Sequence, residues 1–346
     1  MISAADSRFF VLSRCLLAAL LFAVLCGCEK QQTLQFSGSV MGTSYHVTVP
    51  PPYPDFDVQN VEADIADALT AVDELMSTYR EDSELSRFNR APLNQWFPVS
   101  AVTAGLVSDA LELSRLTGGA FDITVGPVVD LWGFGPADTT AELPASESIA
   151  NALNMIGYQA VEVDIESSAL RKSAARRLDL SAIAKGYAVD AVSDLLSEKD
   201  VRNFLVEVGG EVRTRGVNPT GKRWLIGIEQ PDRPPGTAVD AIAIGDAAVA
   251  TSGDYRNYRL IDGRRYSHTI DPVTGMPVDH GLASVTVVET SAARADALAT
   301  GLLVMGTSRA LEFALKQGIA VYLVERRDNG YHTTYSPAFA RHIYGN

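Results

Sequence analysis

The sequence predicts an α+β protein in which mixed or antiparallel sheets and flanking helices form a single intertwined globular domain. Amphipathic helical periodicity recurs along the chain, and short runs of alternating apolar residues lie between the helices. These elements lack the regular β–α–β rhythm of a doubly wound parallel sheet. No shift in composition marks a domain boundary, so one domain is favoured over two.

The N-terminal residues 1–27 have the composition of a secretory signal peptide. Arg8 and Arg14 precede an apolar run at Cys15–Cys26, which is too short to span a membrane. The boundary at Leu25–Cys28 resembles a bacterial lipobox, which predicts cleavage before the last cysteine and acylation of its sulfur. The alternative is an ordinary signal peptide without lipidation. Under the first interpretation, residues 28–35 form a lipidated tether and residues 36–346 the globular domain.

All three cysteines, Cys15, Cys26 and Cys28, lie in or beside this leader. The rest of the chain therefore has no thiol for a disulfide, a thiolate nucleophile or a cysteine metal site. The formal net charge is −13, and the leader itself carries more arginine than acid, so the remainder is more acidic still. An acidic chain argues against binding to nucleic acid and against polybasic attachment to lipid.

The first half of the chain opens on an alternating run around a glycine-containing turn, which predicts a β-hairpin. Apolar residues at i, i+3, i+4 and i+7, with Ser100 as an N-cap, then indicate amphipathic helices. The predicted elements are a hairpin at Leu34–Val49, helices at Val58–Tyr79, Ser100–Leu116 and Ser146–Ile156, a polar turn at Ser83–Asn89, and strands at Val161–Ile165 and Leu178–Leu180.

The second half mixes strands and helices without a repeating order. Glycines close several of these elements, as Gly318 closes the last helix. The predicted helices are Ile183–Leu196, Ala292–Met305 and Ser308–Gln317, and the predicted strands are Asn203–Val208, Trp224–Ile228, Ala241–Ile244, Tyr258–Ile261, Ser284–Val288 and Ile319–Glu325.

An extended run ends in His268, three residues before a tight turn at Asp271–Gly275. The aspartate supplies an Asx acceptor, Pro272 fixes φ, and the glycine can take a positive φ. A histidine held beside such a turn could act as a general base for a hydroxyl, because its ordinary pKa lies near ~6.5. The alternative is a histidine that is satisfied within a strand.

Asp296 and Thr300 lie four residues apart in a predicted helix and so share one face. One carboxylate and one hydroxyl suit a hard cation that keeps some waters and takes other ligands from a substrate phosphate. The alternative is a solvated aspartate followed by a threonine that bonds back to its own helix.

Asp179 is predicted to end a strand, and Ser181 to cap a helix whose N-terminal amides could meet an anion. Lys185 lies on the first turn of that helix, where its charge opposes the helix dipole. Its position is therefore consistent with contact to a ligand phosphate or carbonyl, and a plain surface lysine is the alternative.

Several other site types are excluded by their missing motifs. The chain has no GxxxxGK[ST] or dinucleotide fingerprint, no Gly-x-Ser-x-Gly elbow, and no HxxH or HExxH spacing among its five histidines. Aromatic residues that could wall a planar ligand are Tyr79, Phe121, Trp132, Tyr187 and Tyr255, although most aromatic residues pack in the core.

Taken together, a series of segments resembles the ApbE family, the FAD:protein FMN transferases. The segments follow the family order over nearly the whole chain, which is far more specific than any one motif. They are Met41–Tyr45, Met76–Arg80, Ser83–Asn89, Gly119–Pro127, Asp179–Tyr187, Val208–Glu211, Thr251–Tyr255, His268–Pro272 and Ala295–Thr300.

This resemblance implies an ApbE-like fold and a Mg²⁺-dependent reaction that attaches the FMN part of FAD to a threonine of a target protein, with release of AMP. It implies that His268 is the base that deprotonates the threonine, and that Asp296, Thr300 and the carbonyl of Ala182 bind magnesium. The residues implied to line the FAD site are Met41, Tyr79, Ala120, Phe121, Asp122, Asp179, Lys185 and Ile270.

The resemblance also implies partners and a location. The targets would be flavin-carrying subunits of membrane NADH or ferredoxin redox complexes, and the lipid on Cys28 would hold the enzyme on the periplasmic side of the inner membrane, with the outer membrane as an alternative. Two other activities fit the same residues: a Mg²⁺-dependent FAD pyrophosphatase that yields FMN and AMP, and a non-enzymatic flavin-binding lipoprotein.

Overall fold

The computed structural model describes residues 31–136, 142–231, 233–234 and 236–345. The leader and Cys28 lie outside the described residues, so the signal peptide and the lipid stay predictions. Leu34–Asn346 form one compact unit, and its first strand begins at Leu34, within the expected tether. Among the helices of the described residues, none is both long and apolar enough to cross a membrane.

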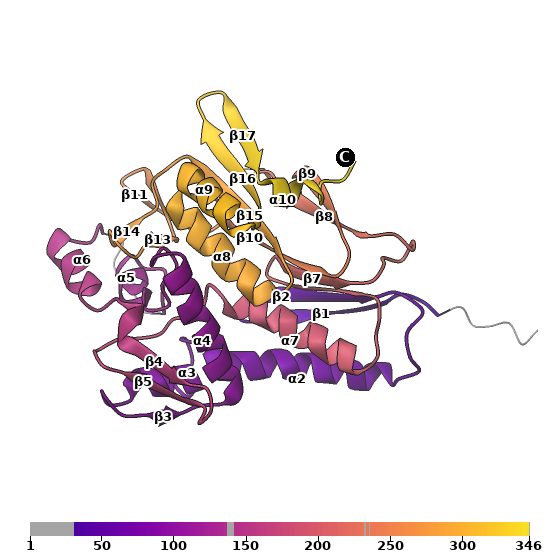
Figure 1. The fold of residues 1–346 in the computed structure, drawn as a ribbon, viewed down its shortest axis with the longest axis horizontal. Coiled ribbons are helices and arrows are strands. Elements are labelled where there is room, and N and C mark those ends of the chain that lie inside the picture. Colours follow the sequence, from indigo (N-terminus) through magenta and orange to yellow (C-terminus); the bar gives the residue numbers. More distant parts are fainter. Residues whose placement is uncertain (1–30, 137–141, 232, 235, 346) are drawn as a thin grey trace, which may run out of the picture. The chain divides into compact units, whose positions relative to one another are not determined.

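The centre of this unit is a sheet in which every neighbouring pair of strands is antiparallel. Figure 1 shows that strands from both ends of the sequence meet in it. In spatial order the strands are β1 (Leu34–Val40), β2 (Thr43–Val49), β6 (Phe204–Val208), β7 (Glu211–Arg215), β10 (Ala247–Gly253), β15 (Leu282–Glu289), β16 (Ala320–Arg327) and β17 (Gly330–Tyr335). The predicted α+β class is confirmed.

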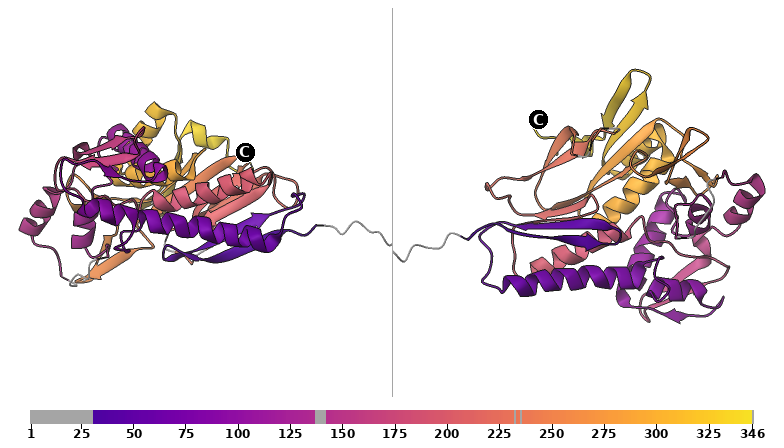
Figure 2. Two further views of the ribbon diagram at one scale, coloured as in Figure 1. Left: turned by 90° about the horizontal axis from the view of Figure 1, so that it is seen from below. Right: turned by 180° about the vertical axis from the view of Figure 1, so that it is seen from behind.

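Helices cover one face of the sheet (Figures 1 and 2). Helix α8 (Ala292–Met305) lies on β10 and β15, α7 (Ala184–Glu198) lies on β6 and β7, and α2 (Val58–Met76) packs on α7. Two further helices, α4 (Ala101–Leu116) and α9 (Thr307–Gln317), pack against α8. The main hydrophobic core fills the space between these helices and the sheet.

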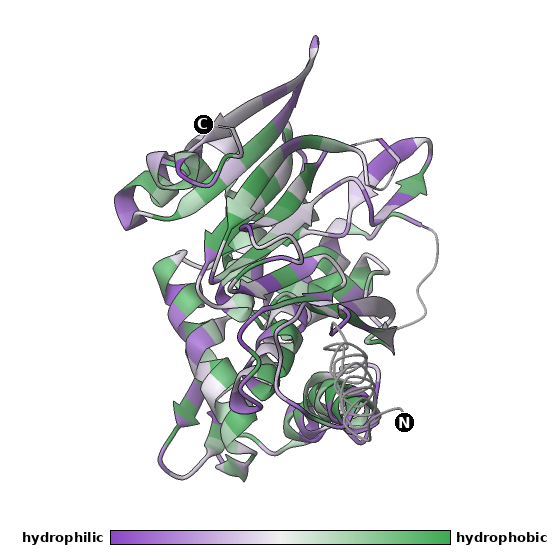
Figure 3. Cartoon of the chain, turned by 90° about the vertical axis from the view of Figure 1, so that its right-hand side faces the viewer, coloured by the Kyte–Doolittle hydropathy of each residue, from purple (hydrophilic) through white to green (hydrophobic). Residues whose placement is uncertain are grey.

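The other face of the sheet has its own, smaller core. Side chains alternate along a strand, so Ala248 and Ala250 of β10 face the helices while Val249 faces the second cluster. That cluster is covered by α10 (Pro337–Ala340) and by the hairpin of β8 (Trp224–Glu229) and β9 (Ala238–Ile244). The apolar central strands can be followed in Figure 3. Burial on both faces makes the sheet a rigid support for its loops.

Smaller elements lie beside the sheet. They are helices α3 (Glu84–Arg90), α5 (Gly126–Leu131) and α6 (Ser146–Leu153), a 3₁₀ turn at Tyr158–Ala160, a sheet of β3 (Phe97–Pro98), β5 (Ala169–Lys172) and β4 (Val161–Asp164), and the pairs β11 (Tyr258–Ile261) with β12 (Arg264–Ser267) and β13 (Ile270–Asp271) with β14 (Met276–Pro277).

The predicted strand at Leu178–Leu180 is wrong. Both leucines are buried, but the main chain of Leu178 bonds to a side chain instead of a neighbouring strand. Its N–H donates to Oδ1 of Asn89 at 2.7 Å, and its carbonyl accepts from Nδ2 of the same amide at 2.9 Å. One asparagine thus satisfies the donor and the acceptor that a strand partner would satisfy.

The polar turn predicted at Ser83–Asn89 is also wrong, because Ser83 is the N-cap of α3 and the other residues lie within this helix. Ser83 caps this short helix by accepting the N–H of Ser86 at 3.0 Å. Conversely, the helix predicted to run to Tyr79 ends at Met76. Tyr79 therefore lies in a loop, with 69% of its surface exposed.

Candidate active site

A cavity of about 1020 Å³ is lined by residues of α7, α8 and β10 and also by residues of β8. This volume is at the upper end of the roughly 300–1,000 Å³ typical of small-molecule sites, which suits a dinucleotide. The residues predicted to bind FAD or magnesium, together with the predicted base, all line it: Met41, Tyr79, Ala120, Phe121, Asp122, Asp179, Ala182, Lys185, His268, Ile270, Asp296 and Thr300.

A close contact between α7 and α8 brings two of these residues together. A Cβ at Gly186 of α7 would lie 2.3 Å from the carbonyl oxygen of Ala292 in α8, so glycine is required for this approach. The N–H of Gly186 donates to Oδ2 of Asp296 at 3.1 Å. Lys185 and Asp296 are therefore neighbours because the two helix backbones almost touch.

The N-terminus of α8 is fixed by a carboxylate from α7. Asp190 accepts hydrogen bonds from the main-chain N–H groups of Ala292 and Ala293 at 3.0 Å each and from Oγ of Ser291 at 2.8 Å. Arg213 of β7 contacts the same carboxylate at 2.8 Å. These bonds satisfy free amides at the helix start and favour its dipole, so they hold α8 in position on α7.

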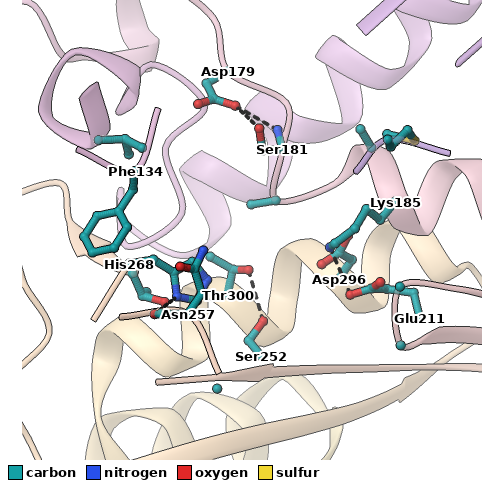
Figure 4. Close-up of a pocket in the computed structure, with 18 of the residues that line it drawn as sticks. Phe134, Asp179, Ser181, Lys185, Glu211, Ser252, Asn257, His268, Asp296 and Thr300 are labelled. Carbon is teal, nitrogen blue, oxygen red and sulfur yellow. Dashed lines mark hydrogen bonds and ion pairs between the residues drawn. The ribbon is translucent and has the colours of Figure 1, made fainter. Parts of the chain in front are cut away.

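Lys185 carries its ammonium between two buried carboxylates, as Figure 4 shows. Its Nζ lies 3.0 Å from Oε1 of Glu211 and 3.5 Å from Oδ2 of Asp296. The surface-lysine alternative is therefore wrong. Burial disfavours the charge on Lys185, but the attraction of the two carboxylates exceeds this effect and raises its pKa. Burial and the nearby Asp296 raise the pKa of Glu211 to about 8, although Lys185 opposes the rise.

Asp296 and Thr300 occupy one face of α8 toward the cavity. Asp296 is 3% exposed, and Thr300 bonds across to Oγ of Ser252 at 3.1 Å, so the alternative of a solvated aspartate with a back-bonded threonine is wrong. The contacts of Asp296 with the N–H of Gly186 and with Nζ of Lys185 both use Oδ2. A carboxylate this deeply buried is stable only when it is paired or coordinates a cation.

The oxygen atoms in this part of the cavity fit a hard cation that takes its remaining ligands from a substrate and from water. One carboxylate, one hydroxyl and the main-chain carbonyl of Ala182, a further residue of the lining, are oxygen ligands of the kind that Mg²⁺ takes when it keeps waters and binds phosphate. Among the described residues no group of three or more His, Cys, Asp or Glu side chains could hold a metal ion. A fully protein-bound cation such as structural zinc is therefore a poorer fit to those residues than magnesium.

His268 lies between β12 and β13, and its ring is held by the main chain. Its Nδ1 is 2.9 Å from the carbonyl oxygen of Asn257. A carbonyl can only accept, so Nδ1 carries the proton and Nε2 has a free lone pair. Burial lowers the pKa of His268, with Lys185 adding to this effect and the Asn257 carbonyl and Asp254 opposing it. The imidazole is therefore neutral near pH 7, with Nε2 able to accept a proton.

The predicted turn after His268 is present. The N–H of Gly275 donates to the carbonyl of Asp271 at 2.8 Å, and Oδ1 of Asp271 accepts the N–H of Val273 at 2.9 Å. Gly275 has a φ of 69°, as its place in the turn requires. Trp132 donates its indole N–H to the carbonyl of the same glycine at 2.8 Å, which fixes the turn on α5.

Two predicted polar residues use their side chains for local structure. Asp122 accepts from the N–H and the hydroxyl of Thr124 at 2.8 and 2.6 Å. Asp179 accepts from the N–H and the hydroxyl of Ser181 at 2.9 and 2.6 Å. The predicted cap at Ser181 is therefore wrong, and α7 begins after Ile183 without a side-chain cap.

The aromatic prediction is correct only in part. Tyr79, Phe121 and Tyr255 line the cavity, whereas Trp132 packs in a separate apolar cluster and Tyr187 lies outside the lining. Sequence reasoning missed Phe134, which also lines the cavity and meets the ring of His268 edge-on at 6.3 Å between centroids.

Sequence reasoning also missed polar residues of the lining, among them Glu211, Ser252 and Asn257. Glu211 and Ser252 lie in segments that resemble the family, so their positions could have drawn notice. Asn257 contributes a main-chain carbonyl, which has no residue-type signal.

The chain is similar to known proteins over most of its length. The model of the ApbE family matches residues 41–323. An FAD:protein FMN transferase of Vibrio cholerae is 42% identical over 325 residues, covering 93% of this chain and 96% of the relative. One of Escherichia coli K12 is 37% identical, covering 94% and 95%.

Solved structures share its fold. The flavin transferase ApbE from Vibrio cholerae has a TM-score of 0.83 at 40% identity, covering 90% of this chain and 99% of that one. The apo form of the Pseudomonas stutzeri flavinyl transferase ApbE also has a TM-score of 0.83, at 38% identity, with coverage of 91% and 98%. A match over most of the sequence, at this identity and with this fold, places the chain in one family. The chain belongs to the ApbE family.

Proposed function

We propose that this chain is an FAD:protein FMN transferase, which moves the FMN part of FAD to a threonine hydroxyl of a target protein and releases AMP. The observation that carries the proposal is one cavity in which an imidazole with a free Nε2 and the oxygen ligands Asp296 and Thr300 are all present. The names of the full-length relatives support the same activity.

His268 would do the proton chemistry. Nε2 takes the proton of the threonine hydroxyl as the oxygen attacks the phosphorus on the FMN side of the diphosphate. A new O–P bond forms, the bond from that phosphorus to the bridging oxygen breaks, and AMP leaves with the bridging oxygen and its electron pair. General-base assistance of this kind typically contributes 10²–10⁴-fold in rate, about what a poor hydroxyl nucleophile needs.

Residues near the diphosphate would supply the positive charge that offsets its negative oxygens. Asp296, Thr300 and the carbonyl of Ala182 would hold magnesium, which when bound neutralises charge on the phosphate oxygens. Lys185 is charged and lies beside Asp296, so it can face the same oxygens. Phe121, Tyr79 and Tyr255 offer aromatic surfaces to a planar ring in the cavity.

The test is a mass measurement on a flavin-acceptor protein that is co-expressed with this chain. The expected result is an FMN-sized mass increase on one threonine, with one AMP released per acceptor. His268→Ala should abolish the increase while FAD still binds. Release of FMN and AMP without labelling would instead indicate a pyrophosphatase, and intact bound FAD without AMP would indicate a flavin-binding protein.

The partners and the location are proposed from the resemblance of the sequence to the ApbE family. The acceptors are flavin-carrying subunits of membrane NADH or ferredoxin redox complexes, and acylation of Cys28 would tether the enzyme on the periplasmic side of the inner membrane. Metabolic labelling with a fatty acid tests the anchor, because Cys28→Ser should remove both the label and the membrane association.

A further inference from the structure

Asp254 and Arg326 form an ion pair beside the cavity, although neither residue is among those that line it. Nη1 of Arg326 lies 3.2 Å from Oδ2 of Asp254, and Nη2 lies 3.3 Å from Oδ1. The carboxylate side chain is 15% exposed. A two-point contact of this kind fixes orientation as well as distance.

The main chain of Asp254 is held as firmly as its side chain. Asp254 follows directly after β10, and its N–H donates to the carbonyl of Ala283 at 3.0 Å. This carbonyl lies at the register shift of β15, between Leu282 and Ser284. The carbonyl of Asp254 accepts from Nη2 of Arg265 at 2.6 Å. Residue 254 is thus an anchor at the start of the bend that connects β10 to β11.

Three residues after this anchor, Asn257 offers its carbonyl oxygen to His268 twice. The oxygen accepts the main-chain N–H of His268 at 3.2 Å and the ring Nδ1–H at 2.9 Å. The ring hydrogen bond decides which nitrogen carries the proton. Without this bond, the neutral imidazole can carry its proton on Nε2 instead of Nδ1. The position of one main-chain oxygen therefore sets the form of the imidazole.

We propose that Arg326 is a positioning residue. Through Asp254 it holds the bend of residues 254–257, so that the carbonyl of Asn257 stays on Nδ1 of His268 and Nε2 remains the proton acceptor. Arg326 reaches this role from β16, close to the end of the chain and away from the reacting atoms. The effect on catalysis rests on the proposed function, whereas the effect on the imidazole does not.

The test is ¹⁵N NMR of the protein labelled at its histidines, because the two ring nitrogens have different shifts in the two neutral forms. His268→Ala identifies the signals of His268. In the unchanged protein we expect Nδ1–H to dominate. In Arg326→Gln we expect a mixture with Nε2–H, and a fall in kcat of roughly 10–100-fold, the range found when comparable partners of ligand histidines are lost. The KM for FAD should stay constant, since no lining residue changes.

Arg327→Gln is the matched control. Arg327 is the next residue of β16, is 56% exposed in its side chain and pairs with Glu325 at 2.6 Å, so its loss should change neither the NMR signals nor kcat. If Arg326→Gln does not fold in a thermal scan, Asp254→Asn breaks the same pair without a change in volume. The double variant should lose no more than the larger single loss, because both act through one contact.

The outcomes separate two ideas. An unchanged Nδ1–H form in both Arg326→Gln and Asp254→Asn would overturn the positioning role, even if kcat fell through a general loss of stability. A shift to Nε2–H with unchanged transfer would support the positioning role and would overturn the proposed function of His268 as the base.

Discussion

The imidazole of His268 is oriented by a main-chain carbonyl, where many catalytic histidines use a carboxylate. A carbonyl fixes the position of the proton without adding a full negative charge, so burial is the strongest influence on the ring and lowers its pKa. A neutral base that stays neutral through mildly acidic conditions suits an attack on a negatively charged diphosphate.

This arrangement predicts the acid side of the pH profile. The base form of His268 is populated above its pKa, which lies below the ordinary value of about 6.5. Transfer measured as kcat/KM should therefore remain level from pH 8 down past about 6.5 and fall only at lower pH. A decline that begins well above pH 6.5 would contradict this prediction. His268→Gln, which has no base at this position, should lose the transfer activity.

The charge of Lys185 also has a testable consequence. Lys185→Met leaves Glu211 and Asp296 without their shared cation, and Glu211 is only 4% exposed. Loss of one partner of a buried charge cluster typically costs about 3–5 kcal/mol. Urea denaturation should show a loss of that order, and adding Glu211→Gln should restore part of it. Equal losses in the single and double variants would argue against the cluster.

At the scale of elements, the α7–α8 contact places Lys185 beside Asp296, one of the proposed cation ligands. Gly186→Ala would put a methyl group within 2.3 Å of the Ala292 carbonyl, which forces the helices apart. We expect a loss of about 1–3 kcal/mol in stability, as overpacking typically costs, together with weaker magnesium binding by calorimetry.

A second glycine provides the control for this prediction. Gly105 lies inside α4, and a Cβ there would meet nothing within 4 Å. Gly105→Ala should therefore stabilise the protein by about 0.4–1 kcal/mol and leave magnesium binding unchanged. If the two substitutions had similar effects, close helix packing at Gly186 would not be the cause.

Elements with strong local signals could be predicted from the sequence. Helix α8 has the predicted bounds, Ala292–Met305, because its residues are almost all apolar, Ser291 caps it and Gly306 follows it. The turn after His268 was predicted from Asx, proline and glycine chemistry. The strand at Leu178–Leu180 was not correctly predicted, because its partner is the Asn89 side chain, distant in sequence.

The residues of the site also divide into those with a local signal in the sequence and those without one. Residues with a chemical signature, such as Asp296 and His268, could be named as candidates. The carbonyl of Asn257 and the ion pair of Asp254 with Arg326 depend on three-dimensional contacts between distant segments, so single-residue reasoning could not find them. Trp132 was misassigned because its aromatic ring gives no indication of which side of α5 it packs on.

At the scale of the whole molecule, ligand binding should couple to unfolding. FAD at about 100 times its Kd should raise the free energy of unfolding by about 2.7 kcal/mol if only the folded chain binds it. Magnesium should increase this stabilisation in the unchanged protein. It should not do so in Asp296→Asn, because this variant lacks the negative charge of the proposed carboxylate ligand. Differential scanning calorimetry with and without each ligand measures both effects, and an equal response to magnesium in the variant would exclude Asp296 as a ligand.

The walls of the cavity come from distant parts of the chain, from Met41 between β1 and β2 to Val304 in α8. A ribosome makes the first of these long before the last, and contacts so distant in sequence can form only when most of the polypeptide is available. A nascent chain therefore has no complete site, and it cannot act on FAD or on a neighbouring protein while it is still being synthesised.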